Sequence, residues 1–293
     1  KIEIPPQQEG TYEVSDEQAR LAVQIIKNLG DYLETYNARV SPGKRYSPES
    51  VGVFLKLMFL SFALTDPSLI GEDMPTTFYS SMDKMVEKRL AQGKKGIIFA
   101  RNTDTINNII SYYQEKGYGV VRIDGTISGD ARDPETGELV RMSYDDEGNL
   151  YLDPKGHKVS SKAYMRWKFQ NDPDTMIVVM NMQAGVGLNL SAADWEVYAQ
   201  LPMNYVEYYQ SSDRALGLNP LLEQNGRKKV EVLFMMPTYS SQFVEHASHT
   251  EDRDYVVHGS PAEIIYNEIM GRDRARFELV IEGLPPDKVE TQD

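Results

Sequence analysis

The sequence predicts an α/β fold in which a mostly parallel sheet is covered by helices on both faces. From residue 96 onward, short apolar runs alternate with amphipathic helical patterns, as they do in βαβ units. These runs are apolar along their whole length, which is typical of parallel strands buried on both faces. With 293 residues and 41% hydrophobic content, the chain can bury a sizeable core.

Residues 1–90 are predicted to form a linker and a helical segment that lead into the sheet. Ser15 and Gln18 have the spacing of a capping box, in which each side chain accepts a hydrogen bond from the other residue's backbone N–H. A further helix is predicted where Pro48 precedes the apolar run 51–64. This run is too short to span a bilayer, so we assign it to the core.

Residues 91–259 are predicted to form the main α/β lobe. The predicted strands are 96–100, 118–124, 175–181, 197–201 and 230–236. Three helices are predicted in this lobe. The first begins at Asn102 or Thr103, the second covers 161–169, and the third follows the fourth strand and contains Gln210 and Arg214. Residues such as Met235 and Met236 in the last strand are assigned to the core.

Three further segments lie outside this strand and helix alternation. Residues 133–160 are rich in Gly, Pro and acidic residues around the strand-like pieces 139–144 and 149–152, which predicts a hairpin insertion. Residues 260–284 begin with a capped start and are predicted to form a closing helix. The tail 285–293 is predicted to be disordered.

Composition narrows the functional classes. The absence of cysteine excludes disulfides and thiolate metal sites. The chain begins at Lys1 without a signal region or a run of eighteen apolar residues, so we expect an intracellular, non-membrane piece of a longer protein. The net charge of −13 argues against nucleic-acid binding over the whole surface.

A local basic strip nevertheless interrupts the acidic chain. No acidic residue occurs over 155–171, where cations alternate with aromatic residues: Lys155, Lys158, Lys162, Tyr164, Arg166, Trp167 and Lys168. This pattern fits either a phosphate-binding surface or a solvated helix face that Trp167 anchors to the core. The strip alone does not decide between them.

Ligands of parallel α/β sheets bind at the carboxyl ends of the strands, so the loops after the strands are the candidate sites. Arg101 to Thr103 follow the first strand, Asp124 to Thr126 follow the second, and 183–190 follow the third. The glycines in this last loop allow backbone N–H groups to approach an anion. A Gly-x-Gly turn by itself is more often only a tight loop.

The order and spacing of these segments resemble the Swi/Snf-type ATPases of helicase superfamily 2, over essentially the whole chain. The similarity is to the second, C-terminal RecA-like lobe. KGIIFARNTDTINNIISYYQEKGYGVVRIDGTIS is similar to motif IV and the segment after it, MIVVMNMQAGVGLNLSAAD to motif V, and YYQSSDRALGLNP to motif VI. The flanks resemble the linker that leaves the first lobe and the helix that closes the family's core.

The resemblance implies a function shared between two lobes. It implies ATP and Mg²⁺ as cofactors, held mainly by an N-terminal RecA-like lobe of the same protein, and duplex DNA as a partner. The implied nucleotide-facing residues are Gly185, Gly187, Asn189, Gln210 and Arg214, with Arg214 as the catalytic arginine that reaches the γ-phosphate. The implied DNA-facing residues are Arg101, Asn102, Thr103, Asp124, Gly125, Thr126, Lys162, Arg166 and Met182. A protein partner at 133–160 is a further expectation, and no metal ligand is expected in this chain.

The sequence also departs from the family pattern. Gly217 stands in place of the second motif VI arginine and Leu216 in place of the histidine. The chain has no GxxxxGK(S/T) loop and no acidic pair after a strand, so we expect it to be inactive by itself. A degenerate, non-hydrolysing lobe that binds DNA or protein is therefore the alternative. An RNA helicase of the same superfamily is a third interpretation.

Two smaller features leave alternatives open. His246 and His249 can bind a metal if they share a helix, although a polar surface loop is the preferred prediction there. Tyr208 and Tyr209 can pack in the core or stack on a base, and packing is preferred.

Overall fold

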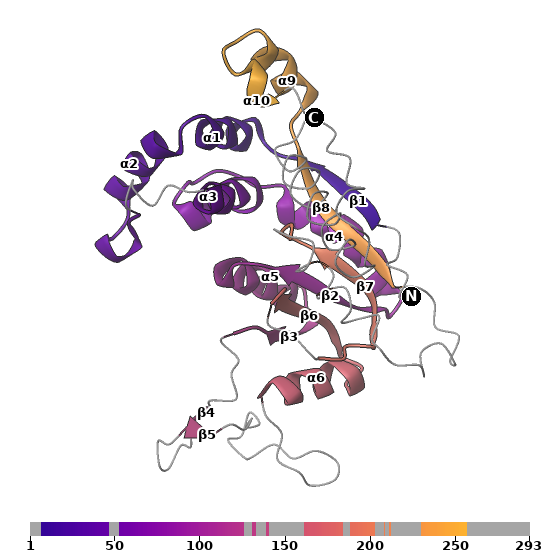
Figure 1. Cartoon of the computed structure of the whole chain (residues 1–293). Coiled ribbons are helices and arrows are strands. Elements are labelled where there is room, and N and C mark those ends of the chain that lie inside the picture. Colours follow the sequence, from indigo (N-terminus) through magenta and orange to yellow (C-terminus); the bar gives the residue numbers. More distant parts are fainter. Residues whose placement is uncertain are drawn as a thin grey trace, which may run out of the picture. The chain divides into compact units, whose positions relative to one another are not determined.

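The computed structural model describes residues 7–46, 53–125, 131–132, 139–140, 161–183, 188–202, 208, 211 and 230–256. It contains a six-stranded parallel sheet with the strand order β1-β8-β7-β2-β6-β3 (Figure 1). The strands are β1 (Gln7–Glu13), β2 (Lys95–Ala100), β3 (Gly119–Ile123), β6 (Thr175–Asn181), β7 (Ala193–Tyr198) and β8 (Glu231–Thr238). The predicted parallel α/β fold is confirmed.

The chain forms two compact units. The first comprises residues 1–8, 87–202 and 206–233, and the second comprises 9–86, 203–205 and 234–293. Strand β8 passes from the first unit into the second.

The first unit contains four neighbouring strands, β7, β2, β6 and β3, with a helix on each side. Helix α5 (Thr103–Glu115) contacts β2, β6 and β3, and helix α6 (Ser161–Asn171) contacts β6 and β3. Figure 1 shows α5 and α6 on opposite sides of these strands. Since both faces are covered, residues 96–100 of β2 are all buried, which explains their continuous apolar sequence.

Glycines are required at two places in this unit. A Cβ atom added to Gly96 on β2 would lie 2.0 Å from ring atoms of Trp195 on β7. Only glycine therefore allows the indole ring to cross β2 at this point. Gly117 ends α5 with φ of 85°, a backbone conformation that other residues rarely adopt.

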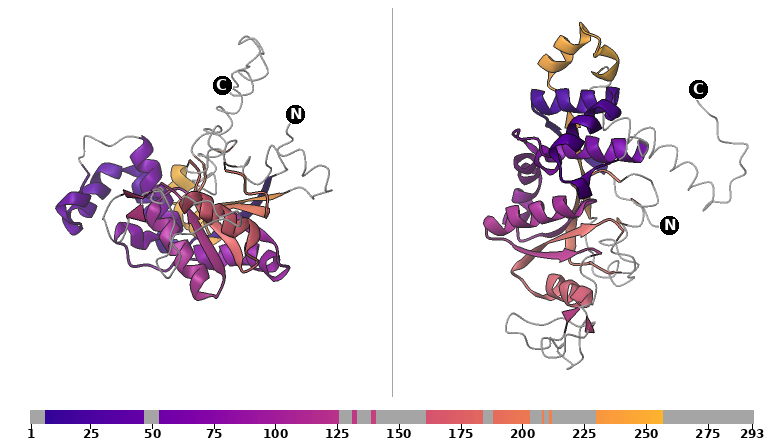
Figure 2. Two further views of the ribbon diagram at one scale, coloured as in Figure 1. Left: turned by 90° about the horizontal axis from the view of Figure 1, so that it is seen from below. Right: turned by 90° about the vertical axis from the view of Figure 1, so that its left-hand side faces the viewer.

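The second unit contains a group of helices. They are α1 (Asp16–Lys27), α2 (Leu29–Arg39), α3 (Val53–Thr65), the first part of α4 (Phe78–Ala91), α9 (Ser241–Ser248), α10 (Arg253–Val256) and two short 3₁₀ turns, Pro42–Lys44 and Pro67–Ile70. Helices α1 and α3 pack against each other, and the right-hand view of Figure 2 shows the indigo and purple helices of this unit. None of the helices among the described residues is long and apolar enough to cross a membrane.

The predicted capping box of α1 is confirmed. Gln18 N donates to Ser15 Oγ at 3.1 Å, and Ser15 N donates to Gln18 Oε1 at 3.3 Å. The Gln18 amide also donates to the carbonyl of Ala63 in α3, at 3.0 Å. The same side chain thus begins one helix and joins it to the end of another.

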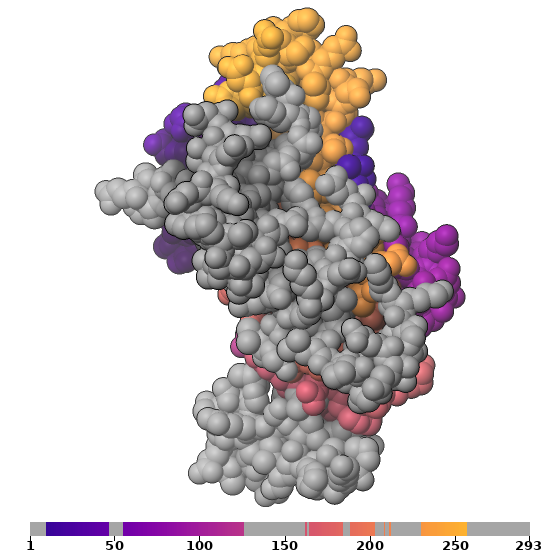
Figure 3. Space-filling model, turned by 45° about the vertical axis from the view of Figure 1, so that its right-hand side comes forward, coloured from indigo at the N-terminus to yellow at the C-terminus, as the bar shows by residue number. Residues whose placement is uncertain are grey.

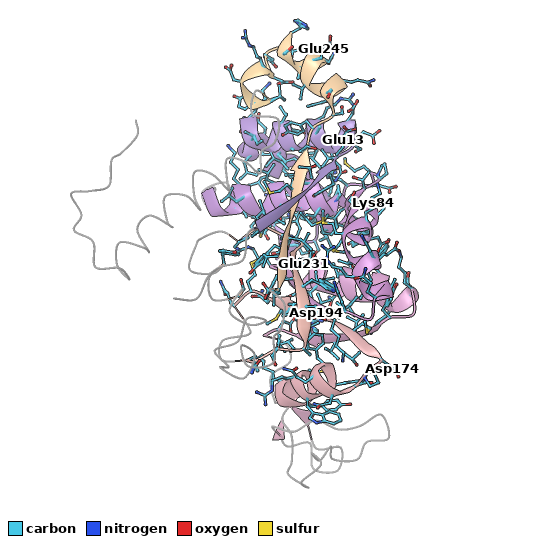
Figure 4. All side chains as sticks on the ribbon, turned by 90° about the vertical axis from the view of Figure 1, so that its right-hand side faces the viewer. Glu13, Lys84, Asp174, Asp194, Glu231 and Glu245 are labelled. Carbon is cyan, nitrogen blue, oxygen red and sulfur yellow. The ribbon has the colours of Figure 1, made fainter. Side chains whose placement is uncertain are left out.

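Strand β7 differs from its prediction over 197–201. It begins at Ala193, and the polar side chains of Asp194 and Glu196 conceal it in the sequence. It ends at Tyr198, after which Ala199 N donates to the Phe99 carbonyl at 2.9 Å. Figure 4 labels Asp194 on this strand.

The predicted surface loop around the two histidines is wrong, because His246 lies in helix α9 and His249 forms its C-cap. Phe243 N donates to Ser240 Oγ at 3.0 Å, which caps the helix. Phe243 and Ala247 are buried one turn apart. Among the described residues, no group of three His, Cys, Asp or Glu side chains is arranged to hold a metal ion.

The hairpin pairing differs in part from the prediction. Leu139–Val140 (β5) pairs antiparallel with Ala131–Arg132 (β4), which directly precedes the predicted insertion at 133–160. The predicted partner at 149–152 lies outside the described residues, as do the closing helix 260–284 and the tail 285–293. Strand β1 and helices α2 and α4 are further elements that the sequence patterns did not predict.

Candidate functional site

The candidate site lies at the carboxyl edge of the sheet in the first unit. β2 pairs in parallel with β6 and β7, and β3 pairs in parallel with β6, so all four strands end at the same edge. The segments that leave these ends begin at Arg101, Asp124, Met182 and Ala199. The topology therefore brings together loops that are up to 98 residues apart, since 199 − 101 = 98.

Gln200 holds the loop after β2. Its side chain is 3% exposed. Its Oε1 atom accepts hydrogen bonds from Arg101 N at 2.8 Å and from Asn102 N at 3.3 Å. Its Nε2 atom donates to Thr105 Oγ1 in the first turn of α5, at 3.3 Å. One buried amide at the end of β7 thus fixes the start of α5.

Asn181 holds the same loop from the other side. Asn181, the last residue of β6, donates from Nδ2 to the Arg101 carbonyl at 2.6 Å. Its Oδ1 accepts from Gln183 N at 2.9 Å. Because Gln200 and Asn181 satisfy the backbone of Arg101, a phosphate at this loop would be met by side chains rather than by these N–H groups.

The predicted DNA-facing residues after β2 lie together at the start of α5. Asn102 is the N-cap residue, Thr103 is exposed, and Arg101 is partly exposed. The Asn102 side chain makes no capping hydrogen bond to the helix. A helix N-terminus that carries a hydroxyl, an amide and a guanidinium is suited to a phosphate oxygen.

Asp124, which was predicted to face DNA, is paired with Arg122. Its carboxylate is buried and accepts from Nε of Arg122 at 2.7 Å and also from Nη2 of that residue. Arg122 Nη1 donates to Asn107 on α5 at 2.6 Å. These contacts join the end of β3 to α5, so Asp124 has a structural role there. Gly125 follows it and is exposed, and Thr126 lies outside the described residues.

Met182 and Asn189, which were also predicted to face DNA and nucleotide, make contacts within the lobe. Met182 is 2% exposed and belongs to the core. Asn189 Oδ1 accepts from Ser191 N at 2.9 Å, and the Asn189 carbonyl accepts from Gln170 of α6 at 2.9 Å. Gly185 and Gly187 lie outside the described residues.

Lys162 and Arg166 of the basic strip lie one turn apart on α6, so they share a face of that helix. Arg166 is exposed and Lys162 is partly exposed. Within the described part of the chain neither makes an ion pair. Tyr164 and Trp167 stack with their ring centres 6.4 Å apart. Figure 3 shows part of the α6 surface in pink-red at the outside of the molecule.

Helix α6 is held at its other end by Lys95. The Lys95 ammonium donates to the carbonyls of Phe169 at 2.7 Å and Asp172 at 2.5 Å, and burial lowers its pKa. Asp172 accepts from the Thr175 hydroxyl at 2.6 Å, which holds its pKa below the ordinary range. These contacts place α6 relative to the start of β2 and β6, where Figure 4 labels Asp174.

Gln210 and Arg214 lie outside the described residues, but two of their neighbours are described. Tyr208 and Ser211 are helical and fully buried. The hydroxyl of Ser211 lies 2.7 Å from the hydroxyl of Tyr198, the last residue of β7. The predicted packing role of Tyr208 agrees with its burial.

The residues that sequence reasoning missed share one signal. Asn181, Tyr198 and Gln200 are polar groups at or just after the ends of buried strands, where a parallel sheet places its ligand edge. At this edge the Asn102 amide, the Thr103 hydroxyl and the Arg101 guanidinium are donors suited to phosphate oxygens, whereas the carboxylate of Asp124 is already paired with Arg122. The described residues therefore fit phosphate oxygens better than they fit Mg²⁺.

Comparison with solved structures finds several that are similar to this chain. The crystal structure of the C-terminal part of the Fun30 ATPase domain matches with a TM-score of 0.51 and 14% sequence identity, over 90% of this chain and 98% of that one. The Sulfolobus solfataricus SWI2/SNF2 ATPase core in complex with double-stranded DNA matches with a TM-score of 0.49 and 19% identity, over 87% of this chain and 47% of that one. The C-terminal domain of the Sulfolobus solfataricus SWI2/SNF2 ATPase matches with a TM-score of 0.45 and 18% identity, over 91% and 94% of the two chains.

This chain spans about half the length of the Sulfolobus solfataricus core that was crystallised with DNA. No protein-family model matches its sequence, and no curated protein matches it. The fold assignment rests on the strand order and on the likeness to Fun30. The chain has the α/β fold of the C-terminal part of the Fun30 ATPase domain.

Proposed function

We propose that this chain is the C-terminal lobe of an ATP-dependent, Swi/Snf-type duplex-DNA translocase. In this proposal, an N-terminal lobe holds ATP and Mg²⁺, and this lobe supplies residues that complete the nucleotide site and grip the DNA backbone. The observation that carries the proposal is the shared carboxyl edge of β2, β3, β6 and β7. The segments that resemble motifs IV and V both leave the sheet there, and Tyr198 at that edge contacts Ser211 of the motif VI-like segment.

The DNA-binding part of the proposal depends on groups that recognise phosphate. Arg101 and Thr103 lie at the start of α5, and Lys162 and Arg166 lie on α6. Such cations and hydroxyls contact backbone phosphates without reading bases. Binding would therefore tolerate any sequence and weaken with salt, as a translocating enzyme requires.

The nucleotide-binding part depends on Arg214 and Gln210. A guanidinium stays charged and grips phosphate oxygens with a planar fork, which suits it to stabilise charge that develops on a γ-phosphoryl group. Closure of the two lobes on ATP would bring Arg214 to the phosphate, and hydrolysis would release it. This cycle would alternate the grip of the lobe on DNA.

ATP hydrolysis by the protein that contains both lobes tests the proposal. We expect Arg214→Ala to lower DNA-stimulated kcat by about 10³-fold or more, and Arg214→Lys to recover little, because lysine lacks the planar fork. Arg20→Ala is the matched control. Arg20 is exposed on α1 and makes no ion pair in the described part of the chain. A kcat for Arg214→Ala within about threefold of wild type would refute the assignment.

Leu216 and Gly217 favour a second candidate, a lobe that binds DNA without hydrolysing ATP. The same assay separates the two. A two-lobed protein that binds duplex DNA but shows no DNA-stimulated hydrolysis would support the second candidate. Comparison of duplex DNA with duplex RNA as stimulators would identify the nucleic acid.

A further inference from the structure

We propose that Tyr198 and Ser211 act as positioning residues for the catalytic arginine, through a buried hydrogen bond here called the Tyr198–Ser211 lock. This inference rests on the proposed function, because it assigns a purpose to the contact that precedes Arg214. It adds that the end of β7 sets the position from which Arg214 reaches the nucleotide.

The lock consists of three buried polar groups. The Ser211 hydroxyl donates to the Tyr208 carbonyl at 2.9 Å. The Ser211 hydroxyl also lies 2.7 Å from the Tyr198 hydroxyl, and either group can donate in this hydrogen bond. The Tyr198 hydroxyl also lies 3.5 Å from the Tyr208 carbonyl. All three residues have 0% relative exposure.

The Tyr198 hydroxyl is itself held in a fixed place. Its ring stacks on Phe99 of β2 with ring centres 4.8 Å apart and planes 25° apart. The same ring also contacts that of Tyr208, with ring centres 5.6 Å apart and the planes tilted. Two adjacent strands, β2 and β7, therefore determine where the hydroxyl lies.

Packing alone does not explain the two hydroxyls. Phenylalanine at 198 and alanine at 211 would leave the apolar contacts in place, and apolar contacts are not directional. Hydrogen bonds between buried groups are directional, so they fix how Tyr208 and Ser211 lie against Tyr198. Arg214 follows Ser211 by only three residues in the sequence, so the position of Ser211 limits where Arg214 can lie.

A small shift at this turn would have a large effect on the reaction. A catalytic group displaced by about 1 Å can lose on the order of 10² in rate. The lock therefore predicts that its loss lowers the rate of the chemical step more than the affinity for ATP. If a hydroxyl served only to stabilise the fold, its removal would change neither the rate of the chemical step nor the affinity for ATP in the folded protein.

The test compares Tyr198→Phe, Ser211→Ala and the double variant with Tyr12→Phe in the two-lobed protein. Tyr12 is the matched control because its buried hydroxyl donates to the Leu64 carbonyl at 3.0 Å in the other unit. We expect kcat to fall by about 10- to 100-fold in both single variants, with KM for ATP within about threefold of wild type. The double variant is expected to be no slower than the slower single variant, because both changes remove the same hydrogen bond. Tyr12→Phe is expected to keep the wild-type kcat.

Hydrogen exchange of this 293-residue chain gives a readout that needs no partner lobe. We expect amides 208–214 to exchange faster in Tyr198→Phe and Ser211→Ala, and to exchange at the wild-type rate in Tyr12→Phe. Wild-type exchange in the first two variants would overturn the lock.

The two proposals fail in different ways. If Arg214→Ala abolishes hydrolysis while Tyr198→Phe and Ser211→Ala keep kcat within about threefold of wild type, the lock is wrong and the proposed function stands. If Arg214→Ala has no effect, the proposed function fails, and the lock has no catalytic group to position.

Discussion

Gln200 offers a sharp test of how the candidate site is built. We predict that Gln200→Met destabilises the chain, because methionine fills a similar volume but cannot accept a hydrogen bond from the backbone. The buried amide of Gln200 accepts from Arg101 N at 2.8 Å and from Asn102 N at 3.3 Å. Both donors would lose their partner at once.

The size of the effect follows from these two contacts. A buried N–H left without a partner costs about 1–3 kcal/mol, and the longer bond to Asn102 N should count for less than the shorter one. We therefore expect the free energy of unfolding to fall by about 2–4 kcal/mol. Gln200→Glu keeps the acceptor oxygens, but it also buries a carboxylate and removes the Nε2 donor to Thr105 Oγ1, so Gln200→Met is the cleaner test.

Urea unfolding of the chain, followed by circular dichroism, measures this difference. Gln24→Met is the matched control, because Gln24 is exposed on α1 and its replacement should change stability by no more than about 0.5 kcal/mol. The reasoning is refuted if Gln200→Met behaves like Gln24→Met.

Three further predictions concern packing, acid stability and DNA affinity. Gly96→Ala should lower the melting temperature and cost about 1–3 kcal/mol, because the new methyl group would lie 2.0 Å from ring atoms of Trp195; an unchanged melting curve would contradict this. The pKa of Asp172 is lowered in the folded chain, so its contribution to stability is complete above its ordinary pKa and is lost as the pH falls through the lowered value; Asp172→Asn should therefore flatten the acid limb of a stability–pH profile. In the two-lobed protein, we expect the double variant Lys162→Ala and Arg166→Ala to bind duplex DNA with a weaker dependence on salt. The slope of log K against log[salt] should become less negative by roughly 2, because two phosphate contacts are lost. An unchanged slope would exclude α6 from the proposed DNA surface.

The sequence predicted the central strands well, because their burial leaves a clear signal. The strand 175–181 has the predicted bounds, and the strands near 96–100 and 118–124 differ by one residue at one or both ends. Residues buried on both faces must be apolar throughout, and turn residues mark their ends. Helix α1 carried an equally clear signal in its capping box.

The errors have physical causes. Strand β7 carries Asp194 and Glu196, which tertiary contacts allow but which an apolar pattern cannot reveal. Helix α9 is a polar stretch that begins at the Ser240 cap and buries Phe243 and Ala247. The local sequence does not show the tertiary contacts that stabilise such segments as a strand or a helix.

The candidate site could be predicted only as a set of loops. Their shared edge follows from parallel pairing, and the structure bears out that arrangement. The direction of each side chain could not be predicted, because Asp124 is paired with Arg122, and Met182 lies in the core. Residues such as Gln200 act through partners about 100 positions away, which a single sequence does not show.

A structure of the two-lobed protein with ADP, Mg²⁺ and a metal-fluoride mimic of the γ-phosphate would test the central claim most directly. The account predicts that the Arg214 guanidinium donates to the mimic at about 3 Å, with the phosphates and Mg²⁺ held by the other lobe. An Arg214 side chain turned into its own lobe, or a mimic contacted by no group of this chain, would contradict it.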